Sequence, residues 1–169
     1  YYKEIIQVIA QKARISIMNE LRKKIFDFIL THQPKREKVM YSWDSIRSIS
    51  IIANGENVDS IAQTLLKEGK HVDIFPVPNK KDIYWFSARP KADIREALQA
   101  RNYDLLIDLT QDTCITALYM AMYIRAGFKT SRHKQDKIYD LIIDTPAQDT
   151  SDFLFEQIVK YIRMFTRRG

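Results

Sequence analysis

The chain has 169 residues, which suits one domain of ordinary size and leaves little room for two. Hydrophobic residues make up 46% of it, enough for a folded core, and its one cysteine, Cys114, excludes a disulfide framework and fits a reducing compartment. The net charge is +6, and residues 1–47 hold ten basic and five acidic side chains. Because no apolar run is long enough to span a bilayer and no signal-peptide pattern is present, we expect a cytoplasmic protein.

Residues 2–31 are predicted to form one long helix or two consecutive helices, because no Gly or Pro interrupts them. Apolar residues recur at three- and four-residue steps from Ile5 to Ile29, which is typical of an amphipathic helix. We expect this apolar stripe to pack against a second copy of the chain, as a homodimer, or against a partner protein, because the main domain can cover its sheet with its own helices. The polar segment 32–45 contains Pro34 and is predicted to be a linker.

Basic side chains dominate the other face of this helix and the linker that follows it. Charge asymmetry of this kind can mark contact with nucleic acid, so RNA is a candidate partner, and a solvated helix face is the alternative that we weigh somewhat higher. The candidate nucleic-acid or anion patch consists of Arg22, Lys23, Lys24, Lys35, Arg36 and Lys38.

The rest of the chain alternates predicted strands and helices, which is typical of a parallel sheet. Gly69 and Gly127 stand where two of the helices are expected to end. We expect two parts, a basic amphipathic helical extension with its linker over residues 1–45 and an α/β domain over residues 46–169. Strands are predicted at 48–53, 71–77, 83–86, 103–108, 128–132 and 139–144, and helices at 58–68, 92–100, 113–126 and 151–165.

Two near-identical runs, Tyr103–Asp108 and Tyr139–Asp144, indicate the fold class. Each has an apolar centre bounded by aspartates and is too short for a buried helix, so each is predicted to be a strand of a parallel sheet covered on both faces. The helix-length segment between them makes the unit β-α-β. The sequence therefore predicts an α/β fold: a mostly parallel, Rossmann-like, three-layer sheet with an N-terminal helical extension.

Ligands in such sheets bind beyond the carboxyl ends of the strands, near the switch in strand order. Asp108, Asp112 and Asp144 are the carboxylates placed to converge there, for Mg²⁺ binding or acid–base work, although structural roles are favoured and Asp112 is expected to cap a helix. Arg132 and His133 lie in a basic cluster that suits an anion, with a solvated loop weighed evenly against it. The candidate ligand-binding residues are Asn54, Gly55, Asp108, Thr110, Asp112, Arg132, His133 and Asp144.

Several kinds of chemistry are not expected. Neither a G-x-G-x-x-G run nor a G-x-x-x-x-G-K-[ST] run occurs, which argues against a dinucleotide or P-loop site. Met120 stands where a cysteine phosphatase built on Cys114 needs an arginine, so a small buried thiol is the favoured interpretation. The three histidines are far apart, which argues against a zinc site. We expect no cofactor and no metal.

Three segments, Tyr103–Leu109, Ala126–Lys129 and Tyr139–Asp144, give residues 47–165 a family resemblance. The chain resembles an uncharacterised family of small bacterial proteins that is classified as a domain of unknown function. The resemblance implies the α/β fold, a basic helical segment before the first strand and a bacterial cytosolic setting, but no activity. Many members carry a glycine where this chain has Ser131-Arg132, which argues against a backbone-anion site.

The strand–helix–strand succession is also similar, more loosely, to the acceptor half of heptosyltransferase-type glycosyltransferases. That enzyme fold needs a second, nucleotide-sugar domain, and this chain lacks the length for it. The similarity therefore implies a fold and no glycosyltransferase activity.

Three functions remain open as hypotheses. The first is a non-enzymatic α/β module that binds a partner through its N-terminal helix. The second is a small ligand-binding protein or enzyme that uses the carboxyl edge of the sheet. The third is an RNA- or ribosome-associated protein that uses the basic N-terminal segment. We favour the first and so lean away from catalysis.

Overall fold

Five parallel strands form one sheet in the order β2-β1-β3-β4-β5 in the computed structural model, which describes residues 1–146 and 148–167. The predicted α/β class and its parallel sheet are confirmed. The strands are β1 (Ser48–Ala53), β2 (His71–Pro76), β3 (Asn102–Asp108), β4 (Arg125–Ser131) and β5 (Leu141–Ile142). The helices are α1 (Tyr2–Thr31), α2 (Asp59–Lys67), α3 (Ala92–Gln99), α4 (Ile115–Tyr123) and α5 (Ser151–Arg167), with 3₁₀ turns η1 (Trp43–Ser45) and η2 (Lys80–Asp82).

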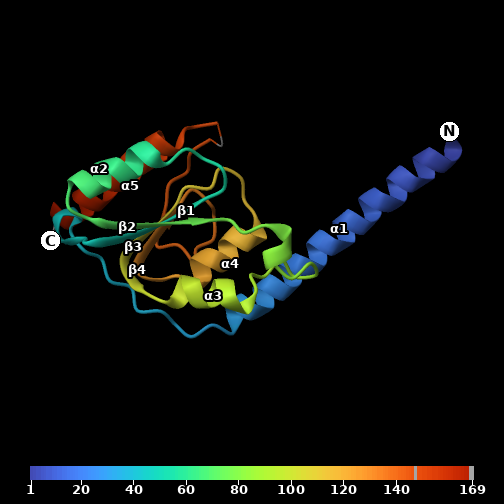
Figure 1. Cartoon of the computed structure of the whole chain (residues 1–169), viewed down its shortest axis with the longest axis horizontal. Helices are drawn as coiled ribbons and strands as arrows, with labels where there is room; N and C mark the ends of the chain where they lie inside the picture. Colours follow the sequence, from blue (N-terminus) through green and yellow to red (C-terminus); the bar gives the residue numbers. More distant parts are fainter. Residues whose placement is uncertain (147, 168–169) are drawn as a thin grey trace.

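Helices cover both faces of the sheet (Figure 1). α2 and α5 lie over one face, where they pack with Ile49, Ile51 and Leu105. α3, α4 and the C-terminal end of α1 lie over the other face, where Ile52 and Leu106 are buried. Because successive side chains of a strand point to opposite faces, the central strands β1 and β3 need apolar residues at nearly every position. This requirement explains their continuous apolar runs.

The boundary between α4 and β4 differs from the prediction. α4 ends at Tyr123 and β4 begins at Arg125, so Gly127 lies inside the strand and does not end a helix. A Cβ atom on Gly127 would lie 3.2 Å from the Tyr41 ring and 3.4 Å from the Val39 carbonyl oxygen. The glycine therefore serves the close approach of the segment that precedes β1.

Two of the predicted strands are also corrected. Residues 83–86 form a loop, in which Ile83 makes an isolated antiparallel bridge with Pro90. Within residues 139–144, only Leu141 and Ile142 form a strand, and it pairs with β4 at the edge of the sheet. A strand at the edge of a sheet pairs with one neighbour only and can be short. The strand within 139–144 is therefore shorter than its similarity to 103–108 predicts.

Residues 33–41, which we call the strap, run along the amino-terminal edge of the sheet. The Val39 amide donates to the Gly127 carbonyl oxygen at 2.9 Å. Arg36 donates to the same carbonyl oxygen at 3.1 Å and to the Asp140 carboxylate at 2.6 Å. The predicted linker is therefore fastened to the domain, and Arg36, which is exposed as a residue, uses its guanidinium group in these contacts.

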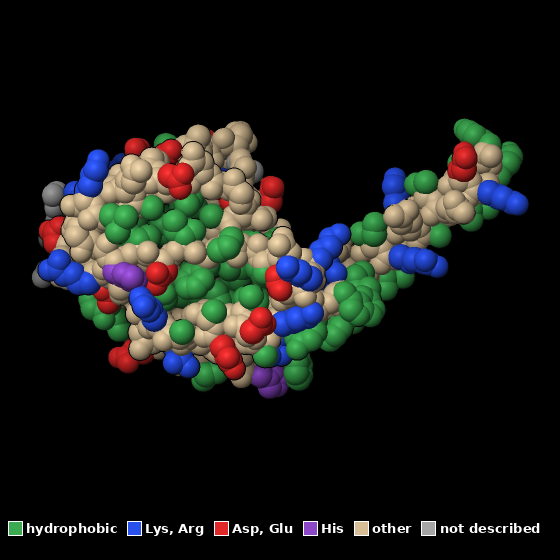
Figure 2. Space-filling view, viewed as in Figure 1, with side chains coloured by type: hydrophobic (Ala, Val, Ile, Leu, Met, Phe, Trp, Pro, Cys, Tyr) green, Lys and Arg blue, Asp and Glu red, His purple; other side chains and the backbone are tan. Residues whose placement is uncertain are grey.

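α1 projects from the domain (Figures 1 and 2). At its base the buried Phe26 ring meets the Tyr119 ring edge-on, with 4.9 Å between the ring centroids, and Arg22 donates to the Trp85 carbonyl oxygen. α1 extends past the domain, so only residues near its C-terminal end pack on the core, where Ile29 and Leu30 lie beside Phe26. The expectation that the stripe packs elsewhere is corrected for that part. In the described part of the chain, no helix is both long and apolar enough to cross a membrane.

Candidate functional site

Asp108 ends β3 at the carboxyl edge of the sheet, and its side chain is fully buried. One carboxyl oxygen accepts hydrogen bonds from the Thr110 amide at 2.9 Å and the Thr110 hydroxyl at 2.6 Å, and the other accepts one from the Tyr139 hydroxyl. Burial raises the pKa of Asp108 above its ordinary value, although the hydrogen bonds from Thr110 and Tyr139 act in the opposite direction. Both oxygens are engaged by donors of this chain.

His133 extends this cluster toward the surface. Its Nε2 atom lies 2.8 Å from the Thr110 hydroxyl oxygen, and its Nδ1 atom lies 3.0 Å from that of Thr113. Because Thr110 gives its single hydroxyl proton to Asp108, Nε2 of His133 is the donor to the Thr110 oxygen. A chain of hydrogen bonds thus joins the buried carboxyl group to the exposed Thr113.

Glu56 bridges the carboxyl ends of β1 and β3, and the sequence analysis did not single it out. One of its carboxylate oxygens accepts a hydrogen bond from the Gln111 amide at 2.6 Å, and the other accepts one from the Asn54 amide. The strand order reverses between β1 and β3, which is where doubly wound sheets bind their ligands. Glu56 therefore occupies N–H groups that an anionic ligand would use there. Its signal in the sequence is an acidic residue just after the turn at Gly55, whose φ is 85°.

Two predicted carboxylates do not join this cluster. Asp112 and Asp144 are both exposed. Cys114, and not Asp112, caps α4, because its sulfur accepts a hydrogen bond from the Ala117 amide at 3.3 Å. Among the described residues, no group of three or more His, Cys, Asp and Glu side chains is arranged to hold a metal ion.

Arg132 and the basic patch have separate surroundings. Arg132 is buried, and its guanidinium donates to the Pro146 carbonyl oxygen at 3.2 Å, so it fastens the chain that follows β5. Arg22 and Arg36 both donate to backbone carbonyl oxygens. Five members of the basic patch are exposed, Lys23, Lys24, Lys35, Arg36 and Lys38, whereas Arg22 is half-buried.

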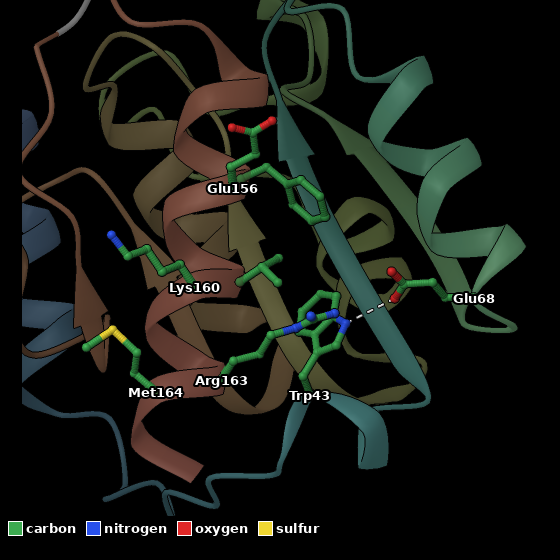
Figure 3. Close-up of a pocket in the computed structure, with 8 residues that line it drawn as sticks. Trp43, Glu68, Glu156, Lys160, Arg163 and Met164 are labelled. Atoms are coloured by element: carbon green, nitrogen blue, oxygen red, sulfur yellow. Dashed lines mark hydrogen bonds between the residues drawn. The ribbon is translucent and has the colours of Figure 1, made fainter. Parts of the chain in front are cut away.

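A pocket of about 460 Å³ lies beside α5, with Trp43 among its lining residues (Figure 3). The Trp43 indole N–H donates to the Glu68 carboxylate at 3.0 Å, and the Arg163 guanidinium lies 6.0 Å from the centroid of the Trp43 ring. Glu156 and Lys160 also line the pocket. Because its charges are of both signs, the pocket does not select an anion or a cation.

A second pocket, of about 970 Å³, lies beneath the strap at the amino edge of the sheet. Lys129 lines it and is buried, and its ammonium donates to the carbonyl oxygens of Ala121 at 2.6 Å and Met122 at 3.3 Å near the end of α4. Burial, and to a smaller extent the charge of Arg36, lower the pKa of Lys129 to about 7, although Asp140 acts in the opposite direction. Lys129 therefore satisfies carbonyl groups that the helix end leaves open.

Residues 44–165 match the family described as a family of unknown function, DUF6913. The match covers more than half of the chain, so the chain belongs to this family. The matched region contains the whole sheet, whereas α1 and the strap precede it. Comparisons with curated proteins and with solved structures gave no match.

Proposed function

We propose that this member of the DUF6913 family is a non-enzymatic partner-binding module, in which α1 is the docking element and a second copy of the chain is the partner. The observation that carries the proposal is the exposed apolar surface of α1 beyond its packed base (Figure 2). Apolar surface of this extent on a projecting helix is typical of an interaction site. The side chains concerned are each 40–67% exposed: Ile5, Ile6, Val8, Ile9, Ile15, Ile17 and Leu21.

The order of apolar residues along α1 suits contact with an identical, antiparallel helix. Ile5, Ile9, Ala13, Ile17 and Leu21 form a ridge with four-residue spacing that is symmetric about Ala13. In a twofold interface the same surface serves both copies, so Ile9 of one copy meets Ile17 of the other. Ridges with this spacing interdigitate at a crossing angle of about 50°. The small Ala13 at the crossing point lets the two backbones approach.

The energy of this contact is moderate. Completing the burial of the four large side chains of the ridge in each copy contributes on the order of 10 kcal/mol. Loss of translational and rotational freedom on association costs a comparable amount, about 4–15 kcal/mol. We therefore expect a reversible dimer, whose population rises with protein concentration.

The contacts at the carboxyl edge support the non-enzymatic part of the proposal. Glu56 takes up the amides of Asn54 and Gln111, and Asp108 is enclosed by Thr110 and Tyr139. Groups that would meet a ligand at this edge are thus bound to one another. For this reason we place ligand binding or catalysis at the carboxyl edge second.

Light scattering after size exclusion tests the docking role of α1. We expect the intact chain to form a dimer and Ala13→Glu to form a monomer, because a carboxylate at the crossing point would be buried without a partner. Gln11→Glu is the matched control: it adds the same charge at an exposed position on the opposite side of the helix and should leave the dimer intact. An intact chain that stays monomeric at high concentration, or an Ala13→Glu variant that stays dimeric, would contradict the proposal.

A further inference from the structure

We propose that Tyr84, Trp85 and Phe86, which we call the aromatic loop, bind single-stranded nucleic acid together with the lysines beside them. The three side chains are 36%, 69% and 43% exposed, whereas Trp43, the other tryptophan, is 3% exposed. Consecutive aromatic rings in water are typical platforms for stacking unpaired bases. The proposal goes beyond the docking role of α1 and places the binding residues outside that helix.

Hydrogen bonds fix the conformation of the aromatic loop. Ala88 has a φ of 58°, in the left-handed region that L-residues adopt at a cost. The Ala88 amide donates to the Tyr84 carbonyl oxygen at 2.7 Å, the Tyr84 amide donates to the Arg89 carbonyl oxygen at 2.9 Å, and the Thr116 hydroxyl donates to the Ala88 carbonyl oxygen at 2.8 Å. Strain of this kind persists where the surroundings enforce it and clusters at functional sites. Here the hydrogen bonds enforce it beside three exposed rings.

Basic residues surround the aromatic loop. The segment 79–91 carries four basic side chains and one acidic one, and Lys80 and Lys81 are exposed. Arg22 donates to the Trp85 carbonyl oxygen through Nε at 3.1 Å and Nη2 at 2.5 Å, which brings the basic end of α1 to the loop. Figure 2 shows Lys and Arg side chains gathered where α1 meets the domain. The loop therefore lies in a region suited to phosphate groups.

This combination favours a single-stranded polyanion over a protein partner. The anchor residues of protein interfaces lie among apolar neighbours that exclude water, whereas these rings are exposed and follow the exposed Lys80 and Lys81 closely in the chain. Phosphates would pair with Lys80 and Lys81 while bases stack on Trp85. The bases of a duplex are already stacked on one another, so the rings select unpaired strands.

Tryptophan fluorescence tests this proposal, because Trp85 is the exposed one of the two tryptophans. We expect an oligouridine of about 12 nucleotides to quench the emission of the intact protein at low salt, with an affinity that falls steeply between about 50 and 200 mM salt. With a labelled oligouridine, Trp85→Leu should weaken binding at least fivefold by anisotropy. The control Tyr161→Leu removes an exposed ring from α5 and should change nothing. Circular dichroism checks that both variants are folded.

Further variants and ligands distinguish binding of single-stranded nucleic acid from general binding of polyanions and from a protein interface. Replacing Lys80 and Lys81 together by glutamine should weaken binding and flatten its salt dependence, because fewer phosphates are then neutralised. Absence of quenching at low salt would overturn the proposal. It would also be overturned if a duplex or heparin bound as tightly as oligouridine and if the Trp85→Leu variant bound oligouridine as tightly as the intact protein. If Trp85→Leu instead dissociates the dimer, the aromatic loop is a protein interface and the proposal fails. The Ala13→Glu monomer reports on α1 separately.

Discussion

The two Tyr-Asp pairs Tyr103-Asp104 and Tyr139-Asp140 make the same kinds of hydrogen bond in the structure. Asp104 accepts a hydrogen bond from the Arg47 amide at 2.7 Å, just before β1, and Asp140 accepts one from the Lys129 amide at 2.8 Å, within β4, so each aspartate binds the backbone of a neighbouring strand or of the residue before it. The tyrosine before each aspartate donates its hydroxyl proton to another carboxylate. Tyr103 reaches Asp73, and Tyr139 reaches Asp108. The repeated pair therefore marks where strands are held to one another.

The carboxylates that the two tyrosines bind differ in burial, and this difference predicts the effect of each tyrosine on stability. Tyr139→Phe leaves the fully buried Asp108 without one of its donors, which we expect to lower the free energy of unfolding by about 1–3 kcal/mol. Tyr103→Phe is the control, since Asp73 is partly exposed and also contacts His71 at 3.1 Å. Its cost should be below about 1 kcal/mol. Urea unfolding of both variants measures the difference, and equal costs would contradict the assigned role of Tyr139.

Part of the Asp108 cluster follows from the sequence, and part does not. Asp108, Thr110 and His133 follow strands in the chain, and strand ends meet at one edge of a parallel sheet, so their proximity is predictable. Tyr139 precedes β5 and reaches Asp108 by folding of the loop that joins β4 to β5. Glu56 depends on the conformation of the turn at Gly55. Contacts made by loops produce no periodic pattern of apolar and polar residues, so the sequence does not predict them.

At the scale of elements, amphipathic helices are predicted well and fully buried ones are not. α3 is found at Ala92–Gln99, within one residue of the expected range, because its polar residues mark the exposed face. In α4, residues from Thr116 to Met120 are all buried, so no polar period shows where the helix ends. Gly127 follows it and resembles a stop signal, yet its role comes from Tyr41, far away in the chain.

The strap offers a prediction at the same scale. Arg36→Met removes the hydrogen bonds to Gly127 and Asp140, so we expect the strap to open more often and trypsin to cleave residues 33–41 several times faster. Lys35→Met is the control, because Lys35 is the exposed neighbour and its loss removes one cleavage site. Mass spectrometry of timed digests identifies the cleaved bonds. Cleavage that is no faster in the Arg36 variant than in the control would show that Arg36 does not fasten the strap.

At the scale of the whole molecule, Lys129 links stability to pH. Its pKa falls from an ordinary 10.5 to about 7 in the folded protein, so between these values the unfolded chain binds a proton that the folded chain lacks. The free energy of unfolding should therefore rise with pH above about 7, by up to about 1.4 kcal/mol per pH unit, and Lys129→Met should remove this rise. Lys80→Met, at an exposed site, is the control. Urea unfolding between pH 6.5 and pH 9.5 measures the slopes, and parallel slopes for both variants would contradict the role of Lys129.

The fixed base of α1 also determines how far apart two domains would stand. Phe26 and Arg22 hold the helix to its own domain, and no Gly or Pro interrupts it, so residues 2–21 project as a stiff arm about 30 Å long. With two copies crossing at Ala13, each Arg22 lies about 14 Å along its helix from the crossing point. The two aromatic loops would then lie on separate arms of one particle. A strand long enough to reach both would bind bivalently, with a gain in avidity that a short strand lacks.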